Sequence, residues 1–337
     1  MAASAHIIKE WRDVDLDIFE NEIVPQNQPA VLRSLIRHWP AVKEGLQSPA
    51  HICKYIKRFD SATPANAIVG APSIKGRFSY RDDLQGFNFE RKRVTVSTAL
   101  DNLVSMIDRP DPPAIAMQAI PVLDVLPGFG QENVLPLVVA AESPRMWLSN
   151  KSTIATHYDI YSNIACVVAG RRRFTLFPPE QVANLYIGPL LTTPGGSPIS
   201  MVDLRQPDLS RYPRFKQALE VCQHADLEPG DAIYIPILWW HSVEALGGLN
   251  VLINYWWNDT KTAAESPFHS MLNSMLSISK LPADQRKIWR DFFDYFVFQA
   301  DSDPAAHLPD DLQDVLGTLT PEQRKELKTL LSQQLLS

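Results

Sequence analysis

Three residues of this chain could bind one divalent metal ion between them. His157 and Asp159 are separated by a single residue on a β-rich stretch, and His241 follows an apolar stretch that begins at Asp231. Two imidazoles and one carboxylate on one face of a metal leave the opposite positions open, as in non-heme Fe(II) sites that react with O₂. The residue types and their spacing therefore predict a metal centre with open coordination positions.

The strands expected around these residues distinguish them from a chance spacing. The chain contains 8 His and 38 acidic residues, and a second triplet, His224-Ala225-Asp226, repeats the His-x-Asp spacing. We interpret this second triplet as a surface feature near a hairpin turn, because no strand pattern of its own accompanies it. Residues 231–241, in contrast, predict one buried strand that ends at His241, and rigid strands position metal ligands accurately.

Short extended segments with Pro- and Gly-marked turns dominate the middle of the chain. Residues 1–110 mix helical and extended patterns, with a helix at 101–107 and a hairpin or two short strands at 71–97. Residues 178–225 read as a long excursion between strands, a kind of segment that often carries function. The expected strands lie at residues 114–119, 145–148, 163–169, 172–177, 232–235 and 251–256.

Ligand-bearing strands that are separated by other strands are typical of a jelly roll. The predicted fold class is therefore mainly β, with a jelly-roll core over about residues 112–261 and flanking N-terminal α/β elements. Helical patterns follow, with a broad apolar face at 283–300 and a helix start at Thr320. We expect one domain over residues 1–261 and a helical region over residues 262–337. The pattern leaves open whether these helices cover their own barrel or form a dimer interface.

Composition excludes several classes of protein. A formal charge of −6 argues against a general polyanion binder and disfavours nucleic acid as a partner. Three widely spaced cysteines form no CxxC motif and are expected to be reduced core thiols. The N-terminus reaches charged residues too early for a signal peptide, and no apolar run approaches the ~18 residues that span a bilayer. The sequence predicts a soluble, cytoplasmic protein without membrane association.

One arginine is a candidate anchor for an anionic co-substrate. Arg171, Arg172 and Arg173 follow the first ligand-bearing stretch, and strand alternation would turn one of them inward while its neighbours face solvent. Arg172 is the middle residue and the candidate. A guanidinium can hold a carboxylate through two parallel hydrogen bonds, as the binding of a keto acid would require. A solvated basic cluster at a turn is the alternative.

A set of motifs in the second half of the chain resembles a known enzyme family. The motifs are His157-Tyr158-Asp159, Asn163, the run 170–181, the run 229–241 and Asn254-Tyr255-Trp256. In order and spacing, residues 146–259 resemble the JmjC and cupin-like Fe(II)- and 2-oxoglutarate-dependent oxygenases. The similarity is most evident toward the asparaginyl hydroxylase that inhibits hypoxia-inducible factor and its bacterial cupin-like relatives.

The resemblance implies a double-stranded β-helix whose C-terminal helices form a homodimer. It also implies that His157, Asp159 and His241 hold Fe(II), and that O₂ reacts at the open face of the metal. Arg172 stands where the family has a lysine that binds the distal carboxylate of 2-oxoglutarate. By the same resemblance, Asn163 and Asn254 line the co-substrate pocket and Trp256 packs near the substrate or co-substrate.

Three departures from the family pattern concern the co-substrate. Arg172 keeps the charge of the family's lysine but needs more room. Ile154 replaces a threonine that is often found three residues before the first ligand, and Thr153 or Thr156 are the candidate substitutes for its hydroxyl. A tyrosine expected near residues 114–119 is absent, with Ala116 and Met117 in that neighbourhood.

The sequence thus predicts a dioxygenase that hydroxylates a protein side chain or a small molecule and releases succinate and CO₂. The residues leave two alternatives open. One is a non-catalytic metal-binding cupin that serves as a sensor or assembly partner. The other is a cupin dioxygenase that does not use 2-oxoglutarate. The sequence does not identify the substrate, and it does not select Fe(II) over another divalent metal.

Overall fold

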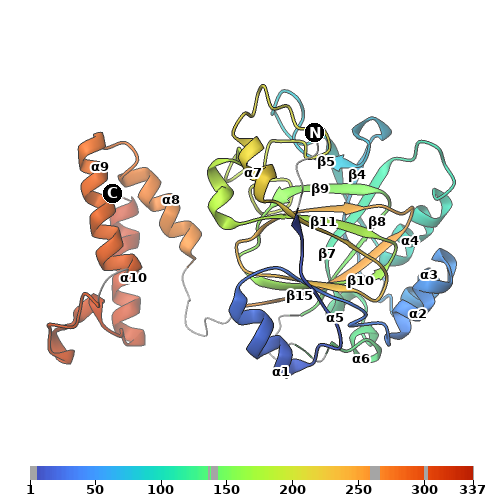
Figure 1. The fold of residues 1–337 in the computed structure, drawn as a ribbon, viewed down its shortest axis with the longest axis horizontal. Coiled ribbons are helices and arrows are strands. Elements are labelled where there is room, and N and C mark those ends of the chain that lie inside the picture. The colour runs from blue at the N-terminus through green and yellow to red at the C-terminus, as the bar shows by residue number, and fades with distance from the viewer. Residues whose placement is uncertain (1–5, 136, 138–142, 259–265, 300–302, 337) are drawn as a thin grey trace. The chain divides into compact units, whose positions relative to one another are not determined.

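Two compact units make up the chain, and each is described by itself. The computed structural model describes residues 6–135, 137, 143–258, 266–299 and 303–336 (Figure 1). The first unit covers residues 1–259 and the second covers residues 260–337. The boundary expected between residues 261 and 262 lies outside the described residues.

Two β-sheets enclose the interior of the first unit (Figure 1). Among the described residues, one sheet has six strands in the order β1-β12-β11-β14-β9-β5 and the other has nine in the order β2-β3-β13-β10-β15-β8-β7-β4-β6. The six strands are β1 (His6–Ile7), β12 (Gln223–Leu227), β11 (Arg172–Phe177), β14 (Trp240–Ala245), β9 (Ser152–His157) and β5 (Arg77–Phe78). The nine strands are β2 (Glu10–Trp11), β3 (Ala30–Leu32), β13 (Ala232–Ile235), β10 (Ser162–Ala169), β15 (Asn250–Trp257), β8 (Arg145–Ser149), β7 (Ala114–Pro121), β4 (Ala65–Gly70) and β6 (Phe89–Val94).

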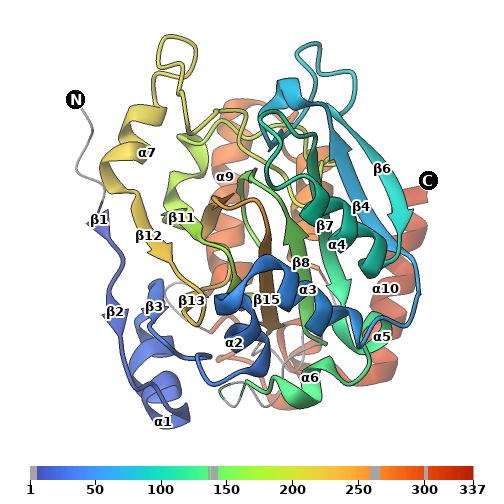
Figure 2. The same cartoon turned by 90° about the vertical axis from the view of Figure 1, so that its right-hand side faces the viewer.

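Apolar side chains fill both sides of the nine-stranded sheet. Between the two sheets, Phe174 and Leu176 of β11 pack with Ile233 and Leu252. Helices cover the outer face, and Figure 2 shows α2 and α3 lying across it. Because both faces are covered, β10 is buried along its whole length, which explains its continuous apolar sequence. The helices of this unit are α1 (Leu16–Ile18), α2 (Pro40–Gln47), α3 (Pro49–Lys57), α4 (Val96–Ser105), α5 (Val122–Val125), α6 (Phe129–Glu132) and α7 (Phe215–Val221).

The second unit is helical. It contains α8 (Pro267–Ser277), α9 (Ala283–Phe293), a π-helical turn (Asp294–Phe298) and α10 (Pro321–Leu336). The predicted start of α10 is confirmed, because the Thr320 backbone N–H donates to Gln323 Oε1 and the Gln323 backbone N–H donates to Thr320 Oγ1. No helix among the described residues is long and apolar enough to cross a membrane.

The predicted mainly-β fold with flanking elements is confirmed, with several local corrections. All six predicted strands are present, and four of them, β7, β8, β10 and β15, are longer than expected. The N-terminal α/β elements are more than a flank, because their strands extend both sheets. The excursion 178–225 contains a strand, β12, and residues 71–97 form two short strands in different sheets, joined at their tip by the bridge Tyr80–Phe87. The three cysteines are buried free thiols, as predicted.

Candidate metal centre and its cavity

The three candidate ligands come together on neighbouring strands. His157 ends β9 and His241 is the second residue of β14, and the two stand directly opposite each other in this antiparallel pair. Their ring centroids are 4.3 Å apart, and His241 Nε2 lies 3.7 Å from Asp159 Oδ2. One ligand atom from each of the three residues lies within 4.8 Å of the others. This spacing is compatible with a single ion bound by all three.

The path of the chain to His241 differs from the sequence prediction. The prediction of one strand from 231 to 241 is wrong, since β13 ends at Ile235 and His241 belongs to a new strand in the other sheet. Pro236 follows β13 directly, and Leu238 adopts a left-handed φ of 65° in the crossing turn. Proline cannot donate to a strand ladder, and the left-handed residue redirects the chain. The Leu238 backbone N–H then donates to the backbone carbonyl of Asp159, and this bond ties the crossing turn to the candidate carboxylate ligand.

A β-bulge in β9 sets which side chains face the ligands. His157 pairs with His241, but Val243 pairs with Ile154, so two residues of β9 stand opposite Ser242 alone. As a result Ile154 and His157, three residues apart, both line the same cavity. A regular strand would have placed them on opposite faces.

Backbone carbonyls orient both imidazoles. His157 Nδ1 donates to the Ala155 carbonyl at 2.9 Å, and His241 Nδ1 donates to the Trp239 carbonyl at 3.0 Å. Because a carbonyl oxygen only accepts, each ring carries its proton on Nδ1 and presents an Nε2 lone pair. Such bonds to the far ring nitrogen are typical of metal-bound histidines. The donor set therefore fits a divalent metal.

His241 is held in the neutral form that a metal requires. Its side chain is 3% exposed. Burial, together with the neighbouring His157, lowers the pKa of His241 to about 4, despite the opposing effect of Asp159. Near neutral pH this imidazole binds a metal without first releasing a proton.

The ligands share one cavity of about 330 Å³ with a buried arginine. Arg172 lies on β11, next to β14, and is 5% exposed. Its Nε and one terminal nitrogen are buried without a hydrogen-bond partner among the described residues, and the same holds for Asn163 Oδ1. Burial lowers the pKa of Arg172 to about 10, so the guanidinium is charged near neutral pH. An unpaired buried cation in a cavity fits a carboxylate ligand.

The alternation predicted for the three arginines is confirmed. Arg172 is buried, whereas Arg171 and Arg173 are exposed. Arg173 instead forms an ion pair with Asp226 of the second His-x-Asp triplet, with Nε 2.7 Å from Oδ1. His224 and Asp226 lie on β12, outside the cluster of potential metal ligands.

Comparison with known proteins agrees with this geometry. The family described as cupin-like domain matches residues 16–263. The chain belongs to this cupin-like family. The resemblance to JmjC and cupin-like oxygenases that the motifs indicated is thereby confirmed.

Three relatives of this cupin-like protein differ in how much of each chain is matched. It is 24% identical to the human bifunctional peptidase and (3S)-lysyl hydroxylase JMJD7 over 78% of its own length and 87% of the relative. It is 38% identical to lysine-specific demethylase JMJ31 of Arabidopsis thaliana over 34% of its length. It is 31% identical to tRNA wybutosine-synthesizing protein 5 of Danio rerio over 41% of its length. The chain spans 21% of the plant protein and 43% of the zebrafish protein.

Two tryptophans of the cupin-like domain organise the polar side chains around the ligands. Trp256 Nε1 donates to Asp159 Oδ2 at 3.1 Å, and Trp147 Nε1 donates to Asn254 Oδ1 at 2.7 Å. Both indoles line the cavity. The sequence placed Trp256 near substrate or co-substrate but did not reveal its bond to the ligand, and it gave no role to Trp147. Only the register of β8, β15 and β10 brings these residues together.

We expect Trp256→Phe to weaken metal binding about 10–100-fold, because a carboxylate ligand that loses its orienting hydrogen bond samples other positions. Titration of the metal-free protein with Mn(II), followed by electron paramagnetic resonance, measures the affinity. Trp147→Phe is the matched control, since it removes an indole N–H that does not reach Asp159. Equal losses in both variants would show that packing, and not the bond to Asp159, is responsible.

The residues that depart from the family pattern lie in or beside the cavity. Ile154 lines the cavity where a hydroxyl was expected. Thr156 is buried, but it is not among the residues that line the cavity, so the hydroxyl substitution expected there has no geometric support. Among the described lining residues there is no tyrosine, and β7 contributes Gln118 and Ala119 instead.

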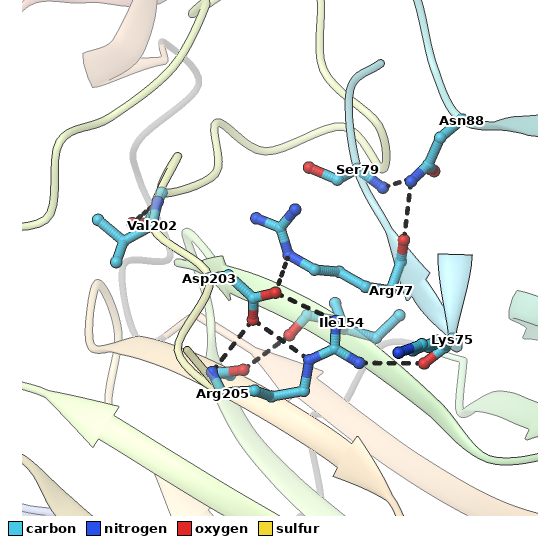
Figure 3. Close-up of polar contacts among 10 residues, drawn as sticks. Lys75, Arg77, Ser79, Asn88, Ile154, Val202, Asp203 and Arg205 are labelled. Carbon is cyan, nitrogen blue, oxygen red and sulfur yellow. Dashed lines mark hydrogen bonds and ion pairs between the residues drawn. The ribbon is translucent and has the colours of Figure 1, made fainter. Parts of the chain in front are cut away.

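The excursion between β11 and β12 forms one wall of the cavity. Ile199 forms a bridge with His157, and residues 194–197 line the cavity. A cluster of charged residues fastens this segment to β5: Asp203 Oδ2 lies 3.6 Å from Arg77 Nε and 3.1 Å from an Arg205 terminal nitrogen (Figure 3). Arg205 also donates to the Lys75 carbonyl at 3.0 Å. The wall is therefore fixed beside the strand that carries His157.

Proposed function

We propose that this cupin-like protein is an Fe(II)- and 2-oxoglutarate-dependent dioxygenase. One observation carries the proposal: the His157–Asp159–His241 cluster shares a single cavity with the unpaired, buried guanidinium of Arg172. A metal site alone would suit many cupins. A metal site beside an unpartnered buried cation is what a chelating keto acid with a second carboxylate requires.

The residues that line the cavity would have the following roles. His157, Asp159 and His241 would hold the metal on one face, and Trp256 would keep the Asp159 carboxylate oriented. Arg172 would bind the distal carboxylate of 2-oxoglutarate, with Asn163 and Asn254 beside it. Bound Fe(II), with 2-oxoglutarate and O₂, supplies the oxidation that yields succinate and CO₂ and hydroxylates a C–H bond. The apolar walls formed by Ile154, Phe174, Val243 and Leu252 would exclude water from that reaction.

The relatives support this reaction class without fixing the substrate. JMJD7 is named a lysyl hydroxylase and JMJ31 a lysine demethylase, while a third relative is named for tRNA wybutosine synthesis. Oxygenation of a C–H bond on a protein side chain or a small molecule is the proposed activity.

The test of the proposal needs no substrate. We expect Fe(II) followed by 2-oxoglutarate, added anaerobically to the metal-free protein, to produce the weak visible charge-transfer band of a chelated keto acid. The band arises because the keto acid occupies the open face of the metal. His157→Ala should abolish it, and visible absorption spectroscopy measures both.

Two other outcomes of this titration would contradict the proposal. Iron binding without the band would favour a non-catalytic metal-binding cupin or an oxygenase that does not use 2-oxoglutarate. A band that persists in His157→Ala would place the metal elsewhere in the protein.

We also propose that a second copy of the chain binds to the C-terminal helices. Several large apolar side chains of this unit are exposed, among them Trp289, Phe292 and Phe298 on α9 and its π-helical turn, and Leu331 on α10. An exposed patch of this kind usually marks an interaction surface. The family resemblance implies a homodimer through the same region.

Phe292→Asp is expected to convert a dimer into a monomer, because a carboxylate cannot be buried in an apolar interface without a partner. Sedimentation velocity measures the change in mass, and Lys287→Asp, which alters a charged position of the same helix, is the control. A wild-type protein that is monomeric at all concentrations would contradict the proposal.

A further inference from the structure

Besides the metal ligands, two groups of residues line the cavity. The first group, which we call the inner arm, includes Arg172 of β11 and Asn163 of β10. The second group, which we call the outer arm, consists of Asn66 and Ile68 of β4, Phe89 and Arg91 of β6, and residues 194–197 of the excursion. In the nine-stranded sheet β6 is the edge strand, and four strands separate it from β10, so the outer arm lies away from Asn163. With 2-oxoglutarate in the inner arm, the outer arm remains for the substrate.

The charged side chains that line the cavity offer a substrate a free cation but no free carboxylate. The charged or titratable side chains among the described lining residues are the three metal ligands, Arg172 and Arg91. Asp159 is thus the one carboxylate among them, and it is committed to the metal and to Trp256. A substrate ammonium group would find no free carboxylate here, whereas a substrate carboxylate would find Arg91.

The guanidinium of Arg91 is held in place with most of its donors free. It lies 5.4 Å from the Phe89 ring centroid and 5.7 Å from that of Phe87. One terminal nitrogen donates to the Pro194 carbonyl at 2.7 Å. No carboxylate among the described residues forms an ion pair with it, whereas the next residue, Lys92, lies 3.5 Å from Glu90. Stacking on aromatic rings fixes the plane of a guanidinium and leaves its N–H edge available for a carboxylate.

We infer that the outer arm is the substrate-recognition subsite and that it binds a carboxylate of the substrate through Arg91. The inference rests on the proposed function for the assignment of the other arm to 2-oxoglutarate. The recognised chemistry is the carboxylate itself, which either a small acid or the acidic side chain of a peptide provides. Arg91 is therefore a specificity-determining residue, and a substrate with a lysyl ammonium at this position is disfavoured.

The experiment measures binding without turnover, by the line broadening of ligand protons in NMR spectra. The acidic probes are N-acetylglutamate and the peptide acetyl-Gly-Gly-Glu-Gly-Gly-amide, and the same molecules with Gln or Lys in place of Glu are the controls. Each probe is titrated into the metal-free protein and into the protein loaded with Mn(II) and saturating 2-oxoglutarate. We expect at least one acidic probe to bind about threefold to tenfold more tightly than its Gln counterpart, and the Lys probes to bind more weakly still.

Substitutions test whether Arg91 causes the preference for acidic probes. Arg91→Gln should remove the preference and Arg91→Glu should reverse it in favour of the Lys probes, with 2-oxoglutarate binding unchanged in both. Arg93→Gln, two residues along the same strand but outside the cavity lining, should behave as wild type. Tyr80→Phe removes another hydrogen bond to the excursion that forms this wall, from Tyr80 to the Thr192 carbonyl, and should also keep the preference.

The outcomes separate the inference from the proposed function. Acidic probes could also reach Arg172 in the metal-free protein, so the preference must persist in Arg172→Met and must be lost when Arg91→Gln is added to that variant. An Arg91-dependent preference in a protein that binds neither metal nor 2-oxoglutarate would retain the subsite and refute the dioxygenase. Lys probes that bind as well as Glu probes, or acidic probes that bind equally to Arg91→Gln, would overturn the inference. Binding of the small acid alone or of the peptide alone identifies the source of the carboxylate.

Discussion

Replacing Arg172 by methionine is expected to abolish 2-oxoglutarate binding and, at the same time, to make the metal-free protein more stable. The guanidinium is buried, and two of its nitrogens have no partner in the described part of the chain, so in the free protein it is a desolvated charge without compensation. Methionine has a similar length and no polar group that needs a partner. The same charge is the anchor that a co-substrate carboxylate would require, so one substitution changes stability and binding in opposite directions.

The shift in pKa gives the sign and the size of the stability effect. Burial lowers the pKa of Arg172 from its ordinary value to about 10. The charged form is therefore disfavoured in the folded protein relative to the unfolded chain. This destabilisation is fully present below pH 10 and disappears as the pH rises from 10 toward the ordinary pKa of an arginine. We expect Arg172→Met to raise the free energy of unfolding near neutral pH by about 1–3 kcal/mol, as for other buried charges replaced by apolar groups.

Two measurements check the prediction. Urea unfolding of the metal-free proteins gives the free energy of unfolding, and calorimetric titration with 2-oxoglutarate in the presence of Mn(II) gives the co-substrate affinity. Affinity should fall by at least about 100-fold in Arg172→Met, which is the scale for losing a charge-assisted bidentate contact. Arg172→Lys is the control that keeps the charge, and it should restore part of the binding. A methionine variant that is less stable than wild type would mean that the guanidinium has partners in the folded protein.

The behaviour of the three arginines illustrates what the sequence could predict. Strand alternation identified Arg172 as the inward residue, and the structure has it buried between two exposed neighbours. That inference works because the period of a strand is a local property of the backbone. The six predicted strands follow from the same local signal, and so does the start of α10 at Thr320.

Features that depend on contacts between distant segments were not predictable. The run 232–240 is apolar throughout, so its sequence does not show that the chain changes sheets after Ile235. The bulge that turns both Ile154 and His157 into the cavity depends on the register between β9 and β14. The outer arm joins β6 to residues 194–197, about a hundred residues away, through the bond from Arg91 to Pro194. Periodicity carries no information about such pairings.

Asp159→Ala is expected to eliminate metal binding while leaving the fold intact. The substitution removes the one carboxylate of the cluster and leaves two imidazoles, so the affinity for Mn(II) should fall by at least about 1,000-fold. In the wild type, metal at 1,000 times its dissociation constant should stabilise the protein by about 4 kcal/mol. A thermal unfolding scan with and without Mn(II) should therefore show an increase in melting temperature for the wild type and none for Asp159→Ala.

The chain provides its own control in the second His-x-Asp triplet. Asp226 has the same spacing from His224 that Asp159 has from His157, but it lies on β12 and forms an exposed ion pair with Arg173. Asp226→Ala should lose at most about 1 kcal/mol of stability, as exposed pairs do, and should keep the full response to metal. If the two variants respond alike, metal binding would not depend on the triad. If only Asp159→Ala loses the response, the difference comes from the strand pairing that brings His241 to one triplet and not to the other.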